Sequence, residues 1–350
     1  MVTQARRQPF PSLRGFPLPS LNTTLGLLLV LALLVWLAIN LVKAPSDFVT
    51  VLLIGVTTGS IYALVALGYT LVYGILELIN FAHGDVFMLG GMASATITID
   101  LVVGHTGAAK WLLIGLTLLI AMAGCGLLNA TIEFFAYRPL RSAPRLAPLI
   151  TAIGVSFILQ NVGLAWKGPN FVDVPSVLPK GTVFSIGGLA YTWNKLIVVL
   201  LTVPVLLLLL WLVQRTRQGK AMRATAQDPD AAAMMGINVN RTISFTFLIA
   251  GALAGAAGLL YALYVTNVRF DQGFQLGLIA FTAAVFGGIG NLPGAVLGAL
   301  VIGLIQAFNE GLSWHAPGSD WTQSIVFSIL ILVLVFRPAG LLGEQTPVSG

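Results

Sequence analysis

Long stretches without a charged residue occupy most of this 350-residue chain. One runs from Phe48 to Leu76, and another, from Gln272 to Asn309, contains 38 residues. A helix needs about 20 apolar residues to cross the hydrocarbon core of a bilayer. Only 9% of the residues are charged, against about 25% in soluble domains. The chain is therefore predicted to be an integral membrane protein, with little length left for a soluble catalytic domain.

The uncharged stretches predict an all-α protein of about ten transmembrane helices, some of them broken or re-entrant. The expected spans are 25–42, 48–76, 86–99, 111–132, 146–166, 196–214, 242–268, two within 272–309, and 321–336. The third is short, so it is either completed by its polar flanks or is a broken helix. The run 272–309 is too long for one helix, and Gly288, Gly290 and Pro293 lie where a turn should fall.

Lys and Arg residues predict the orientation, since cytoplasmic loops carry an excess of them. With the N-terminus inside, twelve of the 18 fall in inner loops and six in outer loops. Residues 1–24 and 337–350 are then cytoplasmic tails around a membrane domain, 25–336, with an outer loop at 167–195 and an inner loop at 214–241. The basic residues are scattered and do not form one long run, which argues against a nucleic-acid partner.

Two Gly-rich breaks are candidates for a translocation path. Polar residues surround the first, at the start of the short third span, and the second lies within 272–309. Interrupted helices in the two halves of a membrane protein point to an internal repeat with a path between the halves. The candidate path residues are Asn80, Phe81, His83, Gly84, Asp85, Gly290, Asn291, Pro293 and Gly294. The alternative for the first group, together with Glu77, is a cap on short helices at the inner membrane surface; for the second it is a tight hairpin.

The inner loop at 214–241 contains helix start and stop signals. Asp228 and Pro229 suit the first turn of a helix. The Ala-rich segment from Asp230 to Met235 then predicts a short helix, which Gly236 ends. Such a loop is either a docking element for a cytoplasmic partner or a solvated connector.

Cysteine and histidine are too sparse for metal or disulfide chemistry. Cys125 is the single cysteine and lies in an apolar run, so no disulfide framework is expected. His83 and Asp85 lie two residues apart, but no further cluster of His or Cys residues joins them. We therefore expect no metal site.

Three stretches together resemble the branched-chain amino acid ABC importer permease family. They are INFAHGDVFMLGG at 79–91, GKAMRATAQDPDAAAMMGIN at 219–238 and FTAAVFGGIGNLPGAVLGALVIG at 281–303. The resemblance implies a multi-pass permease subunit of the bacterial inner membrane. It also implies a second permease subunit, two cytoplasmic ATP-binding subunits and an extracytoplasmic substrate-binding protein as partners.

The resemblance further implies that the inner loop couples to an ATPase subunit. Asp230, Ala231, Ala232 and Gly236 resemble the E-A-A-x-x-x-G head of the importer coupling motif, although its I-x-L-P tail is missing. The residues assigned to coupling are Arg223, Asp228, Pro229, Asp230, Ala231, Ala232 and Gly236. No G-x-x-x-x-G-K-[ST] phosphate loop occurs in the chain, so ATP and Mg²⁺ are expected on the partner subunits. We expect no cofactor and no catalytic activity in this chain.

The function expected is passage of branched-chain or other hydrophobic amino acids by alternating access. The outer loop is predicted to form a small hairpin that contacts the binding protein. A urea or short-amide permease of the same family is one alternative. A proton-coupled secondary transporter, with Glu77, His83 or Asp85 carrying protons, is a second, and a membrane-embedded hydrolase using His83 and Asp85 is a third. The second permease is either a copy of this chain or a different one.

Overall fold

The computed structural model describes residues 21–141, 143–144, 146–179, 181–186, 189–337 and 339–343. The chain forms two compact units, Met1–Pro45 and Ser46–Gly350. The described part of the first unit is essentially one apolar helix, α1 (Leu21–Lys43). Most of the predicted N-terminal tail lies outside the described residues, as do Arg145 and Lys180 of the predicted loops.

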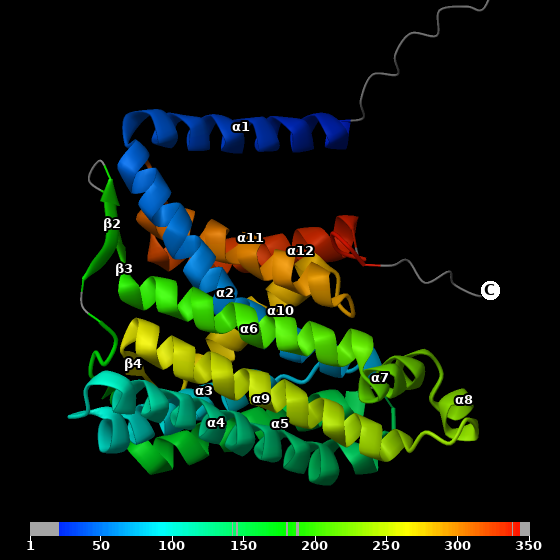
Figure 1. Cartoon of the computed structure of the whole chain (residues 1–350). Helices are drawn as coiled ribbons and strands as arrows, with labels where there is room; N and C mark the ends of the chain where they lie inside the picture. Colours follow the sequence, from blue (N-terminus) through cyan, green and yellow to red (C-terminus); the bar gives the residue numbers. More distant parts are fainter. Residues whose placement is uncertain are drawn as a thin grey trace, which may run out of the picture. The chain divides into compact units, whose positions relative to one another are not determined.

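The second unit is a bundle of long apolar helices (Figure 1). Its main helices are α2 (Pro45–Leu76), α3 (Ala82–Ile97), α4 (Gly107–Ile132), α5 (Leu146–Lys167), α6 (Trp193–Arg215), α9 (Val239–Val265), α10 (Gln272–Gly287), α11 (Leu292–Gly311) and α12 (Thr322–Phe336). Among the described residues, eight helices are long and apolar enough to cross a membrane, and Leu31–Lys43 and Gln272–Gly287 are shorter apolar helices. The all-α membrane class is confirmed, whereas the count of ten spans and the internal repeat stay predictions.

The third span is completed by its polar flank. Helix α3 begins at Ala82, four residues before the predicted start, and continues into a π-helical turn, η1 (Thr98–Val102). The span Ala82–Val102 therefore has 21 residues, which is enough to cross a bilayer. The break in the chain precedes this helix, at residues 77–81.

The two ends of the bundle differ in structure (Figure 1). One end carries the strands β1 (Val172–Asp173), β2 (Thr182–Ile186), β3 (Leu189–Thr192) and β4 (Asn267–Val268). The opposite end carries two short helices, α7 (Arg217–Gln227) and α8 (Pro229–Met234). We call these the outer and inner ends, following the predicted orientation.

The outer loop is only partly the predicted hairpin. Strands β2 and β3 pair antiparallel and form the predicted hairpin. Strand β1 of the same loop lies outside this hairpin, because it pairs with β4. Helix α9 ends earlier than predicted, at Thr266, whose φ of 62° turns the chain. This turn frees the two residues of β4 to pair.

Small residues let the core helices approach closely. Gly251 and Gly255 of α9 face the backbone of α4, while Gly298 of α11 faces α10. A Cβ atom at Gly251 would lie 2.6 Å from the Cβ of Asn129. In membranes such small-residue contacts replace the hydrophobic force that drives helices together in water.

Three shorter helical turns complete the secondary structure. The extension of α4 at the inner end consists of a π-helix, η2 (Glu133–Tyr137), and a 3-10 helix, η3 (Arg138–Leu140). A 3-10 turn, η4 (Ser319–Trp321), leads into α12. The extension of α4 positions a buried ionic cluster that is described below.

Candidate functional site

The turn between α10 and α11 is tight and depends on glycine. Gly288 and Gly290 have φ angles of 110° and 92°, in the region that side-chain-bearing residues rarely adopt. Asn291 then caps α11, its Oδ1 accepting a hydrogen bond from the backbone N–H of Gly294 at 2.9 Å. Pro293 lies in the first turn of the helix, where its missing N–H costs nothing. The predicted break in this long apolar stretch is confirmed.

Residues 339–343, assigned from the sequence to the C-terminal tail, are bonded to this turn. The backbone N–H of Leu341 donates to the carbonyl of Phe286 at 2.9 Å. The Asn291 side-chain amide donates to the carbonyl of Leu342 at 2.8 Å. The segment thus satisfies carbonyls at the end of α10 that a helix leaves open.

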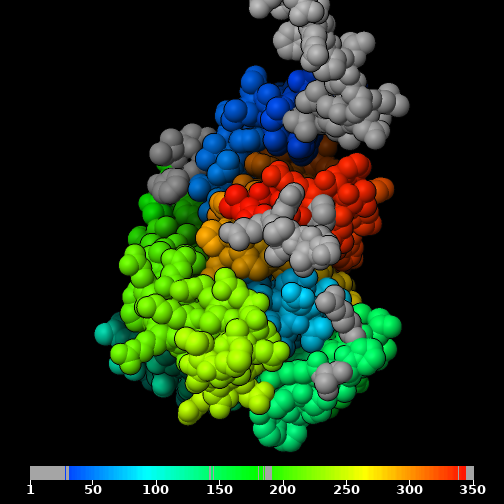
Figure 2. All heavy atoms as spheres, turned by 90° about the vertical axis from the view of Figure 1, so that its right-hand side faces the viewer, coloured from blue at the N-terminus to red at the C-terminus, as the bar shows by residue number. Residues whose placement is uncertain are grey.

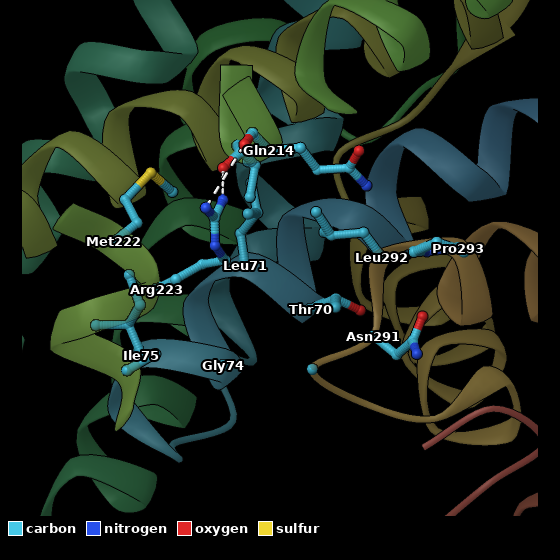
Figure 3. A pocket seen from close by; sticks show the side chains of 13 residues that line it. Thr70, Leu71, Gly74, Ile75, Gln214, Met222, Arg223, Asn291, Leu292 and Pro293 are labelled. Carbon is cyan, nitrogen blue, oxygen red and sulfur yellow. Dashed lines mark hydrogen bonds between the residues drawn. The ribbon is translucent and has the colours of Figure 1, made fainter. Parts of the chain in front are cut away.

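A cavity of about 440 Å³ lies at the inner end, between the end of α2, the α6–α7 corner and the α10–α11 turn (Figure 3). Its lining residues are Thr70, Leu71, Gly74, Ile75, Val213, Gln214, Met222, Arg223, Ala226, Gly290, Asn291, Leu292 and Pro293. The cavity brings together residues from two separate predictions. Arg223, predicted to act in coupling, lines it together with Gly290, Asn291 and Pro293, which were predicted to line the translocation path. Nothing in the amino-acid sequence indicated that these two groups of residues lie together.

Arg223 holds α7 against the end of α6. Its guanidinium donates to the carbonyl of Val213 and, at 3.5 Å, to that of Gln214. Thr216 caps α7 by accepting from the N–H of Gly219 at 3.0 Å. A cation at a helix C-terminus is favourable because the last carbonyls carry partial negative charge. Movement of the inner loop would therefore move the wall of the inner cavity.

The break before α3 is held by a chain of buried amides. Asn80 is 2% exposed, and its Oδ1 accepts from the Tyr137 hydroxyl at 2.7 Å. Its Nδ2 donates to Asn129 of α4 at 3.4 Å, and Asn129 donates in turn to the carbonyl of Phe247 in α9 at 2.7 Å. Glu77, by contrast, is exposed and has a φ of 51°. The break is thus fixed to two neighbouring helices.

His83 and Asp85 lie in the packed core and not on the wall of the inner cavity. Both are 0% exposed. The Ser156 hydroxyl donates to Asp85 Oδ2, and Gln160 donates to Ser156 at 3.2 Å. The His83 ring packs edge-on against Tyr69 with 4.8 Å between ring centroids. These contacts connect the first turn of α3 to α5 and α2.

The remaining predicted path residues at this break contact α10. The rings of Phe81 and Phe281 lie 6.2 Å apart between centroids. A Cβ atom at Gly84 would lie 2.9 Å from Cα of Gly277, so α3 and α10 approach closely there. The structure therefore places the first predicted group beside α10 and the second group at the inner end of that same helix.

The coupling segment has the predicted start and end. Asp228 Oδ1 accepts from the backbone N–H groups of Asp230 and Ala231, both at 2.9 Å, and Pro229 opens α8. Gly236 has a φ of 84°. This is the N-cap, N1 proline and C-terminal glycine arrangement expected for a short helix.

Helix α8 exposes two large apolar side chains. Met234 and Met235 are 82% and 84% exposed, whereas Ala232 is buried. Figure 2 looks onto the inner end and shows the α7–α8 region, in yellow-green, facing outward. Helix α7 was not predicted, because its sequence RQGKAMRATAQ is polar overall and offers one large buried apolar side chain, Met222. Flexible methionines are typical of surfaces that bind other proteins.

Beside the coupling segment lies an ionic cluster that the sequence did not reveal, which we call the Glu133 clasp. The Glu133 carboxylate is fully buried and pairs with Arg138 at 2.9 Å and with Arg141. It also accepts from the Ser244 hydroxyl of α9 at 2.7 Å, and Arg141 donates to Asn240 at 2.6 Å. The clasp therefore joins the inner end of α4 to the first turns of α9, directly after the coupling segment.

The charges of the clasp depend on one another. Burial lowers the pKa of the Arg141 guanidinium, while the Glu133 carboxylate beside it acts in the opposite direction. A buried charge needs such a partner, because leaving water is costly. One feature of the sequence could have indicated this cluster. An acidic residue ends an apolar run and is followed by arginines five and eight residues later.

Within the described part of the chain, no group of three or more His, Cys, Asp or Glu side chains could hold a metal ion. Among the described residues, eight helices long and apolar enough to cross a membrane define a polytopic membrane protein. Residues 51–335 match the family described as branched-chain amino acid transport system / permease component. The chain belongs to this family, whose members in ABC importers work with ATP-binding and substrate-binding partners, and it is a multi-pass plasma-membrane protein.

Curated relatives cover nearly the whole domain. The chain is 40% identical over 294 residues to the high-affinity branched-chain amino acid transport system permease protein BraD of Pseudomonas aeruginosa, covering 83% of this chain and 94% of BraD. It is 38% identical to LivH of Escherichia coli K12, with the same coverage. It is 26% identical to a probable LivH permease of Methanocaldococcus jannaschii, over 81% of this chain and 89% of that protein. No solved structure matches this chain.

Proposed function

We propose that this chain forms the translocation path of an ATP-driven importer for branched-chain amino acids. The observation that carries the proposal is the 40% identity to BraD over 83% of the chain, with the family match over residues 51–335. The full importer would contain a second permease subunit, two ATP-binding subunits and an extracytoplasmic binding protein. The chain itself would bind neither ATP nor Mg²⁺ and would catalyse no reaction.

The exposed face of α8 supports docking to an ATP-binding subunit. Met234 and Met235 point away from the bundle with more than four fifths of their surface exposed, and they end a helix that Asp228 caps. Closure of the ATP-binding subunits would displace α8. The displacement would reach the inner cavity through Arg223 on α7, and it would reach α4 through the start of α9 and the Glu133 clasp. Alternating access would follow from these two connections.

The experiment uses sealed vesicles that contain the assembled importer, with ATP inside, binding protein and labelled leucine outside, and an uncoupler present. We expect uptake that needs ATP and persists with the uncoupler. Met234→Asp should abolish uptake by placing a charge in an apolar interface. Leu146→Asp, which alters another exposed apolar side chain of the inner end, at the start of α5, serves as the matched control.

Three outcomes would redirect the proposal. Uptake that collapses with the uncoupler alone would indicate a proton-coupled transporter and draw attention to Glu77, His83 and Asp85. Uptake of urea without leucine would keep the mechanism and change the substrate. Full uptake by Met234→Asp, with the wild type active, would remove α8 from the interface.

A further inference from the structure

A second cavity, of about 220 Å³, lies at the outer end of the bundle. Its walls come from the outer half of α2, the last turns of α9 and α11, and the first turns of α10. Its polar lining residues are Thr58, Tyr62, Tyr261, Tyr264, Gln306 and Glu310. Since a water molecule occupies about 30 Å³ of liquid, the cavity is large enough for a small organic molecule. None of the residues predicted for the path lines it.

A carboxylate without a cationic partner lies on the wall of this outer cavity. Tyr62 donates to Gln306 at 2.7 Å, and Gln306 donates to Glu310 Oε1 at 3.0 Å. The Thr322 hydroxyl donates to the same oxygen at 2.7 Å. Within the described part of the chain, no Lys, Arg or His pairs with Glu310. One oxygen of this exposed carboxylate is thus held in place by two donors, and no cationic side chain is bonded to it.

The aromatic and apolar walls suit a small amphiphilic cation. Tyr62, Tyr261 and Tyr264 line the cavity, and tyrosine rings attract cations. Ile54, Ile61, Val265 and Leu276 supply aliphatic surface. A carboxylate, aromatic rings and an aliphatic wall are the groups needed to bind an ammonium on a short branched hydrocarbon chain. The Tyr261 hydroxyl on the same wall can donate to a carboxylate on the same molecule.

We propose that the outer cavity is a binding site for an aliphatic amino acid, with Glu310 holding the α-ammonium group. The inference rests on the proposed function, because it assigns the transported amino acid to this site. The site lies on the same two helices, α2 and α11, as the inner cavity. An amino acid released at the outer end would thus first occupy a site on the helices that reach the inner cavity.

The test uses substrate protection from thiol labelling. Cys125 is the only cysteine and is buried, so it gives little background in the folded protein. Thr58→Cys places a thiol on the cavity wall, and Ser313→Cys places one on the exposed outer segment beyond α11. Vesicles holding the assembled importer, without ATP or binding protein, are labelled with a small maleimide. Leucine, isopentylamine and 4-methylpentanoate are added in turn.

We expect leucine and isopentylamine to slow labelling of Thr58→Cys, and 4-methylpentanoate, which lacks the ammonium, to have no effect. Labelling of Ser313→Cys should not change with any of the three. Adding Glu310→Gln keeps the hydrogen-bond acceptor but removes the charge. A hydrogen bond to a charged group contributes about 1.5–3 kcal/mol, so the leucine concentration for half-protection should rise about 10-fold or more. Asp320→Asn, an exposed outer carboxylate outside the cavity, should leave it unchanged.

Protection by 4-methylpentanoate, no protection by leucine, or the same half-protection after Glu310→Gln would overturn the assignment. Unlabelled Cys125 in each variant verifies that the protein is folded. The uptake assay with the wild-type importer separates the two proposals. Leucine uptake without protection rejects the outer site alone, whereas a wild type that takes up no leucine rejects the proposed substrate.

Discussion

Two glycines near the α4–α9 contact should respond in opposite directions to the same substitution. Gly251 of α9 faces α4, and a Cβ there would lie 2.6 Å from the Cβ of Asn129 and 2.9 Å from the carbonyl carbon of Cys125. Gly124 of α4 has nothing within 4 Å of the corresponding position. Alanine at Gly251 therefore requires the helices to separate, while alanine at Gly124 requires no movement.

The size of the effect follows from these distances. Carbon atoms pack at about 3.5–4.0 Å, so Gly251→Ala must separate the helices by roughly 1 Å. The Asn129 to Phe247 hydrogen bond, 2.7 Å long, crosses the same contact and would be lost. Overpacking and the lost bond together should cost about 2–4 kcal/mol. Gly124→Ala should instead stabilise the helix by about 0.5–1 kcal/mol.

Cys125 provides the assay, because it is the only thiol and is buried in α4, where its Sγ contacts Val86 of α3. Purified protein in detergent is heated with a dye that fluoresces on reaction with a thiol, and helical circular dichroism is followed in parallel. We expect Gly251→Ala to unfold below the wild type and Gly124→Ala at or above it by both measurements. If both variants shift in the same direction by similar amounts, the close contact between α4 and α9 is wrong.

Three further substitutions test the inner end. Glu133→Ala leaves two arginines without their buried partner and should destabilise the protein by about 3–5 kcal/mol in thermal or denaturant unfolding. The control is Asp271→Asn, which breaks the half-exposed pair with Arg269 and should cost less than about 1 kcal/mol. Asp228→Ala removes the cap of α8 and should destabilise the helix by about 0.5–2 kcal/mol, which should speed amide hydrogen exchange at Asp230 and Ala231. The control is Asp230→Ala, whose side chain makes no capping bond and which should not speed exchange at Ala231. Arg223→Ala should detach α7 from α6 and speed tryptic cleavage after Arg217. Lys220→Ala should leave the rate of that cleavage unchanged. Equal cleavage rates in the two variants would show that Arg223 does not hold α7.

The sequence by itself determined the membrane class, the position of most spans and the coupling helix. These features depend on neighbouring residues. Uncharged runs of spanning length have to be helical in lipid, where backbone groups find partners only within the segment. Asp228, Pro229 and Gly236 act on the helix that they begin and end. The α10–α11 break likewise follows from local glycines with positive φ.

Only the tertiary structure decided which distant residues meet. Gly251 and Gly124 are both glycines in apolar helices, and nothing local shows that Gly251 packs against another helix while Gly124 faces open space. Glu133 pairs with arginines across an irregular turn and bonds to Ser244, more than a hundred residues away. Three other contacts also join residues that are distant in the sequence. They are the pairing of β1 with β4, the approach of Arg223 to the α10–α11 turn, and the position of Glu310 among tyrosines from α2 and α9. They arise because the packing of the helices determines which side chains become neighbours. The spacing of residues along the sequence does not show how the helices pack.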